Sequence, residues 1–190
     1  CHALSRDGRR IAVGRFIPAP ATTEINDVAT RTALGSSFGA NFEAFSADSS
    51  LLVASNGAHL ELRDGASGAP AAGLAAGLVG SMPDWSADGT SVVYSAPATV
   101  PFFGGTPGHD PPADLRVLSW AAGAFGAPAT LLGSAGENNY YPAYSPDGAF
   151  VLFNRSAGNS YGALDAHLWV VAAGGGVPVE LANANGPGDQ

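Results

Sequence analysis

The stretch that decides the fold is Tyr-Pro-Ala-Tyr-Ser-Pro-Asp-Gly at residues 141–148, which is followed by the apolar run 150–153. Its Ser-Pro-Asp-Gly core has the composition of a tight hairpin turn. Proline suits the second position of a type I turn, aspartate bonds nearby backbone N–H groups, and glycine adopts the positive φ that closes the bend. An apolar run directly after such a turn indicates a β-strand.

The same pattern occurs three more times along the chain, so we interpret the sequence as a set of repeats. Each copy has an apolar or aromatic residue, Ser, any residue, Asp, then Gly or Ser, and an apolar run. The serines are Ser5, Ser46, Ser86 and Ser145, which stand 41, 40 and 59 residues apart. We assign the repeated aspartates to structural turns and not to a ring of ligands; they are Asp7, Asp48, Asp88 and Asp147. Ser49 replaces glycine in the second copy, which predicts a strained turn or another turn type.

A repeat of about 40 residues that holds several short strands is typical of propeller blades. We therefore predict an all-β protein, a single β-propeller domain of four blades with four antiparallel strands each. The expected blades cover about residues 1–41, 42–81, 82–139 and 140–190, and an inserted loop at 97–113 explains the longer step. Because the first blade lacks most of its inner strand, we expect an arc of a larger ring that remaining blades of the parent chain complete.

Two of the repeats also point to a known family. Residues 141–148 and the segment Met-Pro-Asp-Trp-Ser-Ala-Asp-Gly at 82–89 resemble the repeat of TolB-like, WD-repeat-like β-propellers, which reads Pro-x-aromatic-Ser-Pro-Asp-Gly before an apolar run. The resemblance covers most of the chain. It implies that the strand before each turn lies innermost, against a central channel. It also implies a bacterial protein in a periplasmic or extracellular setting, where a non-catalytic module binds or scaffolds a protein or a small ligand.

The charge of the chain excludes one class of partner. Sixteen acidic residues stand against eight basic residues, all of them Arg, and the net charge is −8. Such a chain lacks the cationic surface that neutralises phosphates, so we expect neither nucleic acid nor an anionic membrane as a partner. Glycine and proline interrupt the long uncharged stretches, so no membrane span is predicted.

Cys1 and His2 are the residues that could hold a cofactor. If a Cys stands three positions before Cys1, the sequence reads C-x-x-C-H, in which Cys1 carries the thioether bond to haem c and His2 ligates the iron. This gives an alternative function, the propeller part of a haem-bearing periplasmic redox protein. Two other interpretations of Cys1 stay open, a lipidated first residue and an inert thiol.

No catalytic site is predicted from the sequence. Two G-x-S-x-G matches, at 35–39 and 158–162, lack the helical pattern that follows a nucleophilic serine. No pair of histidines has the spacing of metal ligands, so no metal site is predicted either. A further alternative is the gating propeller of a larger serine hydrolase, whose catalytic residues belong to a separate domain.

The residues before the fourth turn are the candidates for a ligand or partner rim. Tyr140 and Tyr141 are consecutive, so in a strand they face opposite sides and one of them can reach a channel. Polar neighbours and the expected inserted loop complete the set, which is Glu137, Asn138, Asn139, Tyr140, Tyr141, His109 and Asp110.

Overall fold

A computed structural model describes residues 2–15, 22–56, 58–98, 112–160 and 163–185. Strands and the turns between them dominate these ranges, and the only helix within them is the three-residue 3-10 helix η1 (Ala182–Ala184). No helix in the described residues is long and apolar enough to cross a membrane. The all-β prediction is confirmed.

Antiparallel sheets follow one another along the chain, and we number them as blades. The first blade contains β1 (His2–Leu4), β2 (Arg10–Arg15) and β3 (Thr22–Asp27), and the second contains β4 (Phe42–Phe45), β5 (Leu51–Ser55) and β6 (Leu60–Asp64). In both blades the fourth strand is reduced to two isolated bridges. They join Asn26 to Ala33 and Thr23 to Phe38 in the first blade, and Arg63 to Pro70 and His59 to Val79 in the second.

The later blades are larger. The third contains β7 (Ser81–Trp85), β8 (Ser91–Pro97) and β9 (Ala113–Ala121), with β10 (Ala124–Phe125) and β11 (Ala129–Leu132) paired to β9. The fourth contains β12 (Asn138–Tyr144), β13 (Phe150–Ser156), β14 (His167–Ala172) and β15 (Val179–Glu180). A single parallel bridge from Asn138 to Ala113 joins these two blades.

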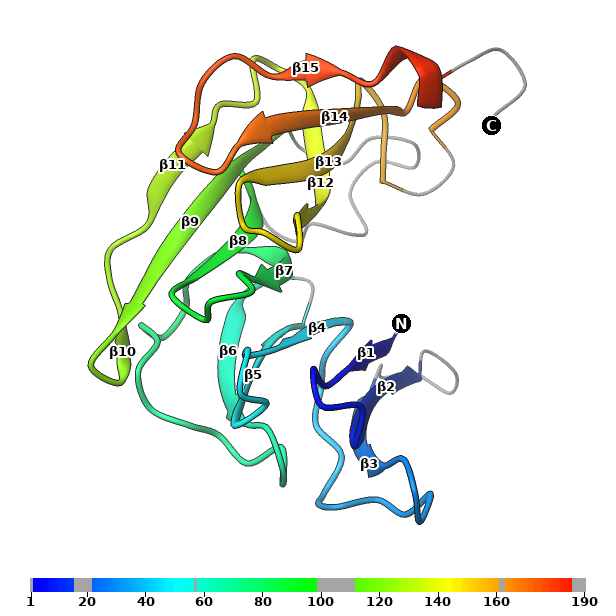
Figure 1. The fold of residues 1–190 in the computed structure, drawn as a ribbon, viewed down its shortest axis with the longest axis vertical. Helices are drawn as coiled ribbons and strands as arrows, with labels where there is room; N and C mark the ends of the chain where they lie inside the picture. The colour runs from blue at the N-terminus through cyan, green and yellow to red at the C-terminus, as the bar shows by residue number, and fades with distance from the viewer. Residues whose placement is uncertain (1, 16–21, 57, 99–111, 161–162, 186–190) are drawn as a thin grey trace.

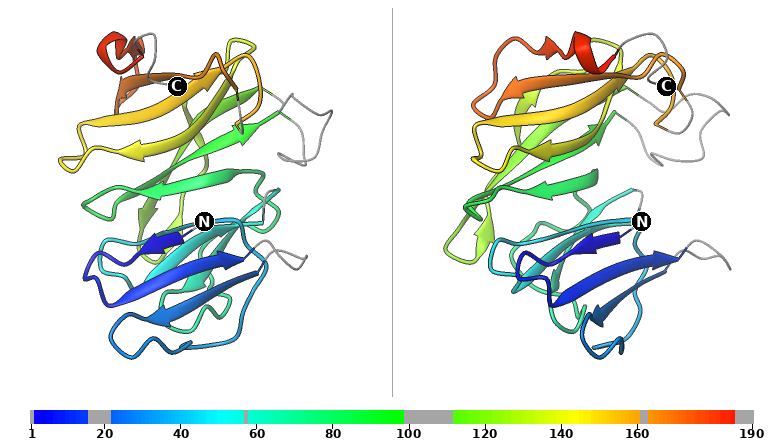
Figure 2. Two further views of the ribbon diagram at one scale, coloured as in Figure 1. Left: turned by 90° about the vertical axis from the view of Figure 1, so that its right-hand side faces the viewer. Right: turned by 45° about the vertical axis from the view of Figure 1, so that its right-hand side comes forward.

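The blades fan out as an open arc, with the first and fourth blades at its two ends (Figure 1). Figure 2 shows the same sheets stacked one above another along the arc. The strand before each turn is innermost, since β1 contacts β4, β4 contacts β7 and β7 contacts β12. Among the described residues no strand of the first blade pairs with the fourth, so the sheets form a propeller arc and not a closed ring.

Each repeated turn is built by the same side-chain hydrogen bonds. In the third blade the Ser86 hydroxyl donates to Asp88 Oδ1 at 2.6 Å and accepts the backbone N–H of Ser91 at 3.0 Å. Asp88 Oδ1 also accepts the backbone N–H of Thr90 at 3.0 Å. The other three turns repeat these contacts, with Ser Oγ to Asp Oδ1 distances of 2.6–2.7 Å. The aspartates therefore lie in turns, and each of them joins two strands of its blade.

The second turn keeps this geometry in spite of its missing glycine. Ser49 has a φ of 62°, close to the 70–72° of Gly8, Gly89 and Gly148 at the equivalent positions. The turn is therefore strained and of the same type, because a side chain in the left-handed region costs about 1–2 kcal/mol. The Ser49 hydroxyl is also buried and has no hydrogen-bond partner in the described part of the chain.

Apolar side chains between consecutive blades form the core. Ala12 and Ile25 of the first blade pack against Phe45, Leu52 and Ala54 of the second. Between the second and third blades, the packed residues are Ala44, Val53, Leu60, Leu62, Trp85, Val92, Tyr94, Ala96 and Leu118. Between the third and fourth, they are Val93, Leu115, Val151, Phe153 and Val171. Each sheet therefore buries both of its faces only when it has a neighbour on each side.

We predict that Ser49→Gly stabilises the protein by about 1 kcal/mol, because glycine removes the left-handed strain and an unpartnered hydroxyl. Urea unfolding followed by circular dichroism measures the change. The matched control is the reverse substitution Gly148→Ser, where an added Cβ meets no atom within 4 Å, so only the backbone strain should lower stability. Equal effects of the same sign from both variants would contradict the assignment of strain to this position.

A candidate binding site at the axis of the arc

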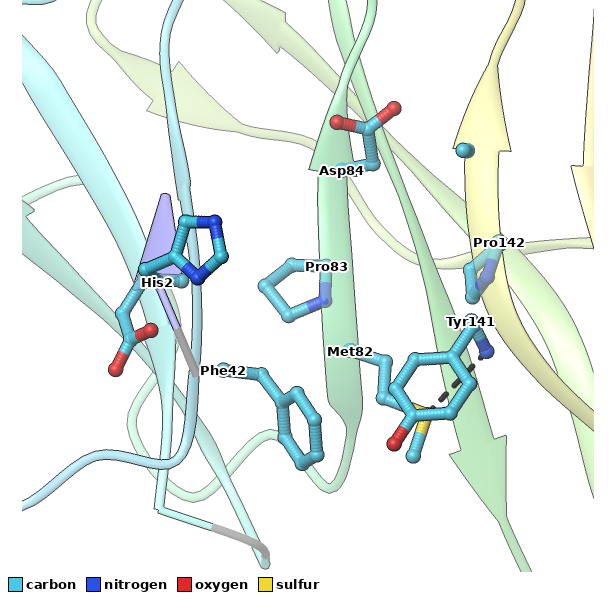
Figure 3. A pocket seen from close by; sticks show the side chains of 9 residues that line it. His2, Phe42, Met82, Pro83, Asp84, Tyr141 and Pro142 are labelled. Atoms are coloured by element: carbon cyan, nitrogen blue, oxygen red, sulfur yellow. Dashed lines mark hydrogen bonds between the residues drawn. The ribbon is translucent and has the colours of Figure 1, made fainter. Parts of the chain in front are cut away.

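A hollow of about 420 Å³ opens among the inner strands of the four blades. We call it the axial hollow. Its walls come from the residues two to four positions before the turn serines, and Figure 3 shows their side chains around one space. They are His2, Phe42, Glu43, Met82, Pro83, Asp84, Tyr141, Pro142 and Ala143.

Two prolines shape the hollow by interrupting the inner strands. Pro83 and Pro142 lack a backbone N–H, and the strand register shifts around both, between Ser81 and Asp84 and between Tyr140 and Ala143. The residues before them, Met82 and Tyr141, have φ of 52° and 50°. A residue before proline normally adopts an extended conformation, so both positions are strained. Strain of this kind at equivalent positions of two blades is typical of sites with a function.

An apolar wall forms where these strained residues meet. The Phe42 and Tyr141 rings lie edge to face with centroids 5.8 Å apart, and the backbone N–H of Tyr141 donates to Met82 Sδ at 3.3 Å. Met82 is 3% exposed, whereas Tyr141 is 36% exposed. Met82 thus supports the wall from beneath, and the Tyr141 ring is the part that a ligand can touch.

Glu43 places a carboxyl group beside the hollow in an unfavourable environment. Its Oε1 accepts a hydrogen bond from the Thr23 hydroxyl, but its Oε2 is buried and has no partner among the described residues. Burial raises the pKa of Glu43 above its ordinary value, and the hydrogen bond from Thr23 opposes the shift only in part. The buried charge is therefore incompletely compensated within the chain.

Asp84 lies on the neighbouring inner strand, and its pKa is raised as well. Burial raises the pKa of Asp84, while the backbone N–H of Tyr144, 2.7 Å from Oδ2, and the nearby Arg6 charge oppose that shift. Glu43 and Asp84 together line a second hollow of about 380 Å³ that adjoins the first and includes Arg6. Two desolvated carboxyl groups in adjoining hollows favour a cationic or hydrogen-donating ligand.

The structure places one of the rim residues expected from the sequence at the hollow and buries others. Tyr141 lines the hollow, but Tyr140 is buried in a cluster with Phe42, Met82 and Ala113. Asn138 and Asn139 are also buried, at 2% and 0% exposure, and therefore do not form a rim in this structure.

Asn139 and Glu137, which precede the fourth turn, stabilise the fourth blade. Asn139 accepts a hydrogen bond from Arg155 Nε at 2.8 Å and donates to the Ala113 carbonyl at 2.9 Å. Glu137 lies 3.5 Å from the same Arg155 nitrogen. The Arg155 guanidinium also stacks over Trp169, 4.9 Å from the ring centre. This network fastens β12 to β13 and β14, which is a structural role.

Several expected features lie outside the described residues. They include Cys1, His109, Asp110 and most of the inserted loop, residues 99–111. His2 is described, and it lines the axial hollow next to Glu43 from the first strand. Among the described residues, no three His, Cys, Asp or Glu side chains are grouped so that they could hold a metal ion.

Sequence reasoning missed the two carboxyl groups and most of the apolar wall. The available signal was a charged residue inside an otherwise apolar inner strand, as in Phe-Glu-Ala-Phe at 42–45 and Ser-Met-Pro-Asp-Trp at 81–85. An acidic side chain is rarely buried in a strand that packs on both faces unless it has a partner or a function.

The fold and the axial hollow define the chain as an open arc of a β-propeller. Comparison with solved structures shows that the blades have a TolB-like fold. The chain is similar to TolB from Acinetobacter baumannii (18% identity, 95% of this chain and 42% of that one, TM-score 0.63) and to a putative TolB from Agrobacterium tumefaciens (14%, 95% and 64%, 0.67). It is also similar to an oligogalacturonate lyase in complex with manganese (20%, 95% and 51%, 0.66).

The chain matches only part of each of these known proteins. The chain spans between 42% and 64% of the length of these three structures. No family model matches the sequence, and no curated protein sequence does. At identities of 14–20% the comparison shows the fold alone, and one fold can serve proteins of different function, here TolB proteins and a lyase.

We predict opposite pH dependences for two carboxyl groups. Because the pKa of Glu43 is raised in the folded state, Glu43 lowers the stability of the protein as pH rises above the pKa of the unfolded state. Glu43→Gln should therefore stabilise the protein at pH 7 and lose that advantage near pH 4. The pKa of Asp48 is lowered, first by the Ser46 hydroxyl, so its contribution is present at pH 7 and is lost as pH falls below about 4.

Asp48→Asn should therefore destabilise at pH 7 and have a smaller effect in acid. Urea unfolding of both variants and the wild type between pH 3 and pH 7 provides the test, with the same fluorescence signal throughout. A Glu43→Gln protein that is less stable than the wild type at pH 7 would show that this carboxylate is compensated.

Proposed function

We propose that this chain is a non-catalytic binding module that receives a small ligand or a protruding segment of a protein partner in its axial hollow. One observation carries the proposal: an open hollow with an aromatic wall adjoins two carboxyl groups whose charge the chain compensates only in part. Binding sites are typically concave and mostly apolar, with a few converging polar groups. The packed inner strands provide the rigid support that such a site needs.

The charge of the walls favours a positive group on the ligand. Glu43 and Asp84 are acidic, and among the described residues that line the axial hollow His2 alone is basic. An ammonium or guanidinium group would stabilise both carboxylates, and an aromatic face such as that of Tyr141 attracts a cation as well. A lysine or arginine side chain of a partner has this chemistry. The resemblance to TolB-like repeats supports a periplasmic or extracellular setting for such a contact.

A single methionine makes the proposal directly measurable. Met82 is the only Met of the protein and lines the axial hollow, so a ¹³C-methyl label on methionine gives one NMR signal from the site. Argininamide should shift this signal saturably, whereas acetamide and N-acetylaspartate should shift it little. Glu43→Gln and Asp84→Asn should each weaken argininamide binding by roughly tenfold, as expected for loss of a charge-assisted hydrogen bond.

The control variant is Glu180→Gln, which removes an acid from β15, far along the sheet from the inner strands. It should leave the argininamide affinity unchanged. A signal that no probe shifts would contradict the hollow as a binding site. Equal shifts by all three probes would leave the site in place and overturn its preference for cations.

A redox role is the second candidate, because His2 reaches the axial hollow, where a partner or cofactor would lie. Haem c attachment requires a Cys three positions before Cys1. The residue at that position in the parent gene tests this directly: any other residue ends the haem proposal.

A catalytic role of the parent protein, as in the similar lyase, is tested by measuring activity of the full-length protein with and without Glu43→Gln and Asp84→Asn.

A further inference from the structure

A basic side chain lies beside the two acids at the axis of the arc. Arg6 lines the second hollow, of about 380 Å³, together with Glu43 and Asp84. Its Nη2 donates to the Trp85 carbonyl at 2.9 Å, which holds this guanidinium of the first blade against the third blade. The bond uses one of the five N–H groups of a guanidinium. The Arg6 side chain is therefore anchored and still has N–H groups to offer to a ligand.

Arg6 and Asp84 are close enough to influence each other, but they are not paired. The Arg6 charge helps to oppose the rise in the pKa of Asp84. None of the ion pairs within the described ranges includes Arg6, and Asp84 Oδ2 instead accepts the backbone N–H of Tyr144 at 2.7 Å. Opposite charges thus border one hollow without touching, so a ligand that carries both a cation and an anion can reach each of them.

Strand β7 sets the order of three chemical environments along the two hollows. Met82 supports the aromatic wall, and Asp84 follows two residues later. Trp85 comes next, and its carbonyl holds Arg6. In Figure 3, Asp84 lies on the far side of Pro83 from the Met82 side chain. A strand rises roughly 3.3 Å per residue, so the apolar wall, the acid and the base follow one another within about 10 Å.

This order matches the groups of an α-amino acid with an apolar side chain. The ammonium group, the carboxylate and the side chain of such a molecule are all bonded to one carbon atom. Its side chain would lie against the Phe42 and Tyr141 rings, whose centroids are 5.8 Å apart. Its two charged groups would then lie at the acids and at Arg6, which are the walls shared by or nearest to the second hollow.

We propose that the axial hollow and the second hollow together bind a free α-amino acid with an aliphatic or aromatic side chain. The ammonium group donates to Glu43 and Asp84, the carboxylate accepts from Arg6, and the side chain packs on the aromatic wall. This inference rests on the proposed function, because it names the ligand of the same site.

Ligands with a single charge fit this arrangement less well. A cation without an anion is repelled by Arg6, and an anion without a cation is repelled by Glu43 and Asp84. The first residue of a peptide has an ammonium group but no carboxylate at the same carbon atom, and the last residue has the carboxylate alone. The paired charges of the site therefore favour a free amino acid over a segment of a protein.

Four small probes test this pairing through the methyl signal of Met82. L-phenylalanine should shift the signal saturably. Phenethylamine lacks the carboxylate and N-acetyl-L-phenylalanine lacks the ammonium group, and each should bind at least about tenfold more weakly, as expected for loss of a charge-assisted hydrogen bond. Glycine has both charges but no side chain, so it should displace L-phenylalanine only at concentrations at least about tenfold higher than L-phenylalanine itself requires.

The variant Arg6→Gln separates the contact to the carboxylate from the contacts to the ammonium group. It should weaken L-phenylalanine by about tenfold and leave phenethylamine no weaker, because the repulsion of that cation is removed as well. Arg9→Gln is the matched control: Arg9 is exposed in the same turn, lines neither hollow, and its loss should leave both affinities unchanged. Circular dichroism should show that both variants remain folded.

The outcomes distinguish this inference from the proposed function on which it rests. If phenethylamine or N-acetyl-L-phenylalanine binds as tightly as L-phenylalanine while argininamide still shifts the signal, the hollow remains a binding site and the amino acid is overturned as its ligand. Equal weakening of L-phenylalanine and phenethylamine by Arg6→Gln would also overturn it, since Arg6 would then only support the site. A signal that none of these probes nor argininamide shifts overturns both proposals.

Discussion

The hydrogen bond from a turn serine to the aspartate two residues later is the constraint on which every blade depends. It orients the serine hydroxyl so that the oxygen accepts a backbone N–H at the start of the next strand, as between Ser86 and Ser91. This fixes the register of the hairpin. Because side chains alternate across a strand, a slip of one residue would move Val92 and Trp85 from one face of the blade to the other. The packing between blades therefore depends on four small polar turns.

The axial hollow exists because two inner strands depart from this regular pairing. Pro83 and Pro142 cannot donate to a ladder, and the residues before them take a strained left-handed conformation. Next to these irregular segments the chain retains Glu43 and Asp84, whose buried charges reduce stability. Strained backbone and desolvated acids in one place lower stability together, and this combination is expected where a site serves binding.

The all-β class, the four turns and the innermost position of the strand before each turn could be predicted from residue types and spacing. The strain at Ser49 could be predicted too, since the position requires a positive φ. The site was harder to predict. Alternation placed Tyr140 and Tyr141 on opposite sides of a strand, but it did not show that Asn138 and Asn139 are buried. The partners that hold the buried Asn139 side chain, Arg155 and Ala113, come from other strands.

Local chemistry accounts for what the amino-acid pattern alone specifies: where the chain turns, which runs become strands and which residues alternate. These features arise from backbone preferences and hydrogen bonds within a few residues. Which faces stay uncovered and which acids share a hollow are decided only by the arrangement of the blades in space. Glu43, Asp84 and Tyr141 belong to three different blades, so only the packing of the blades around one axis brings them to one hollow.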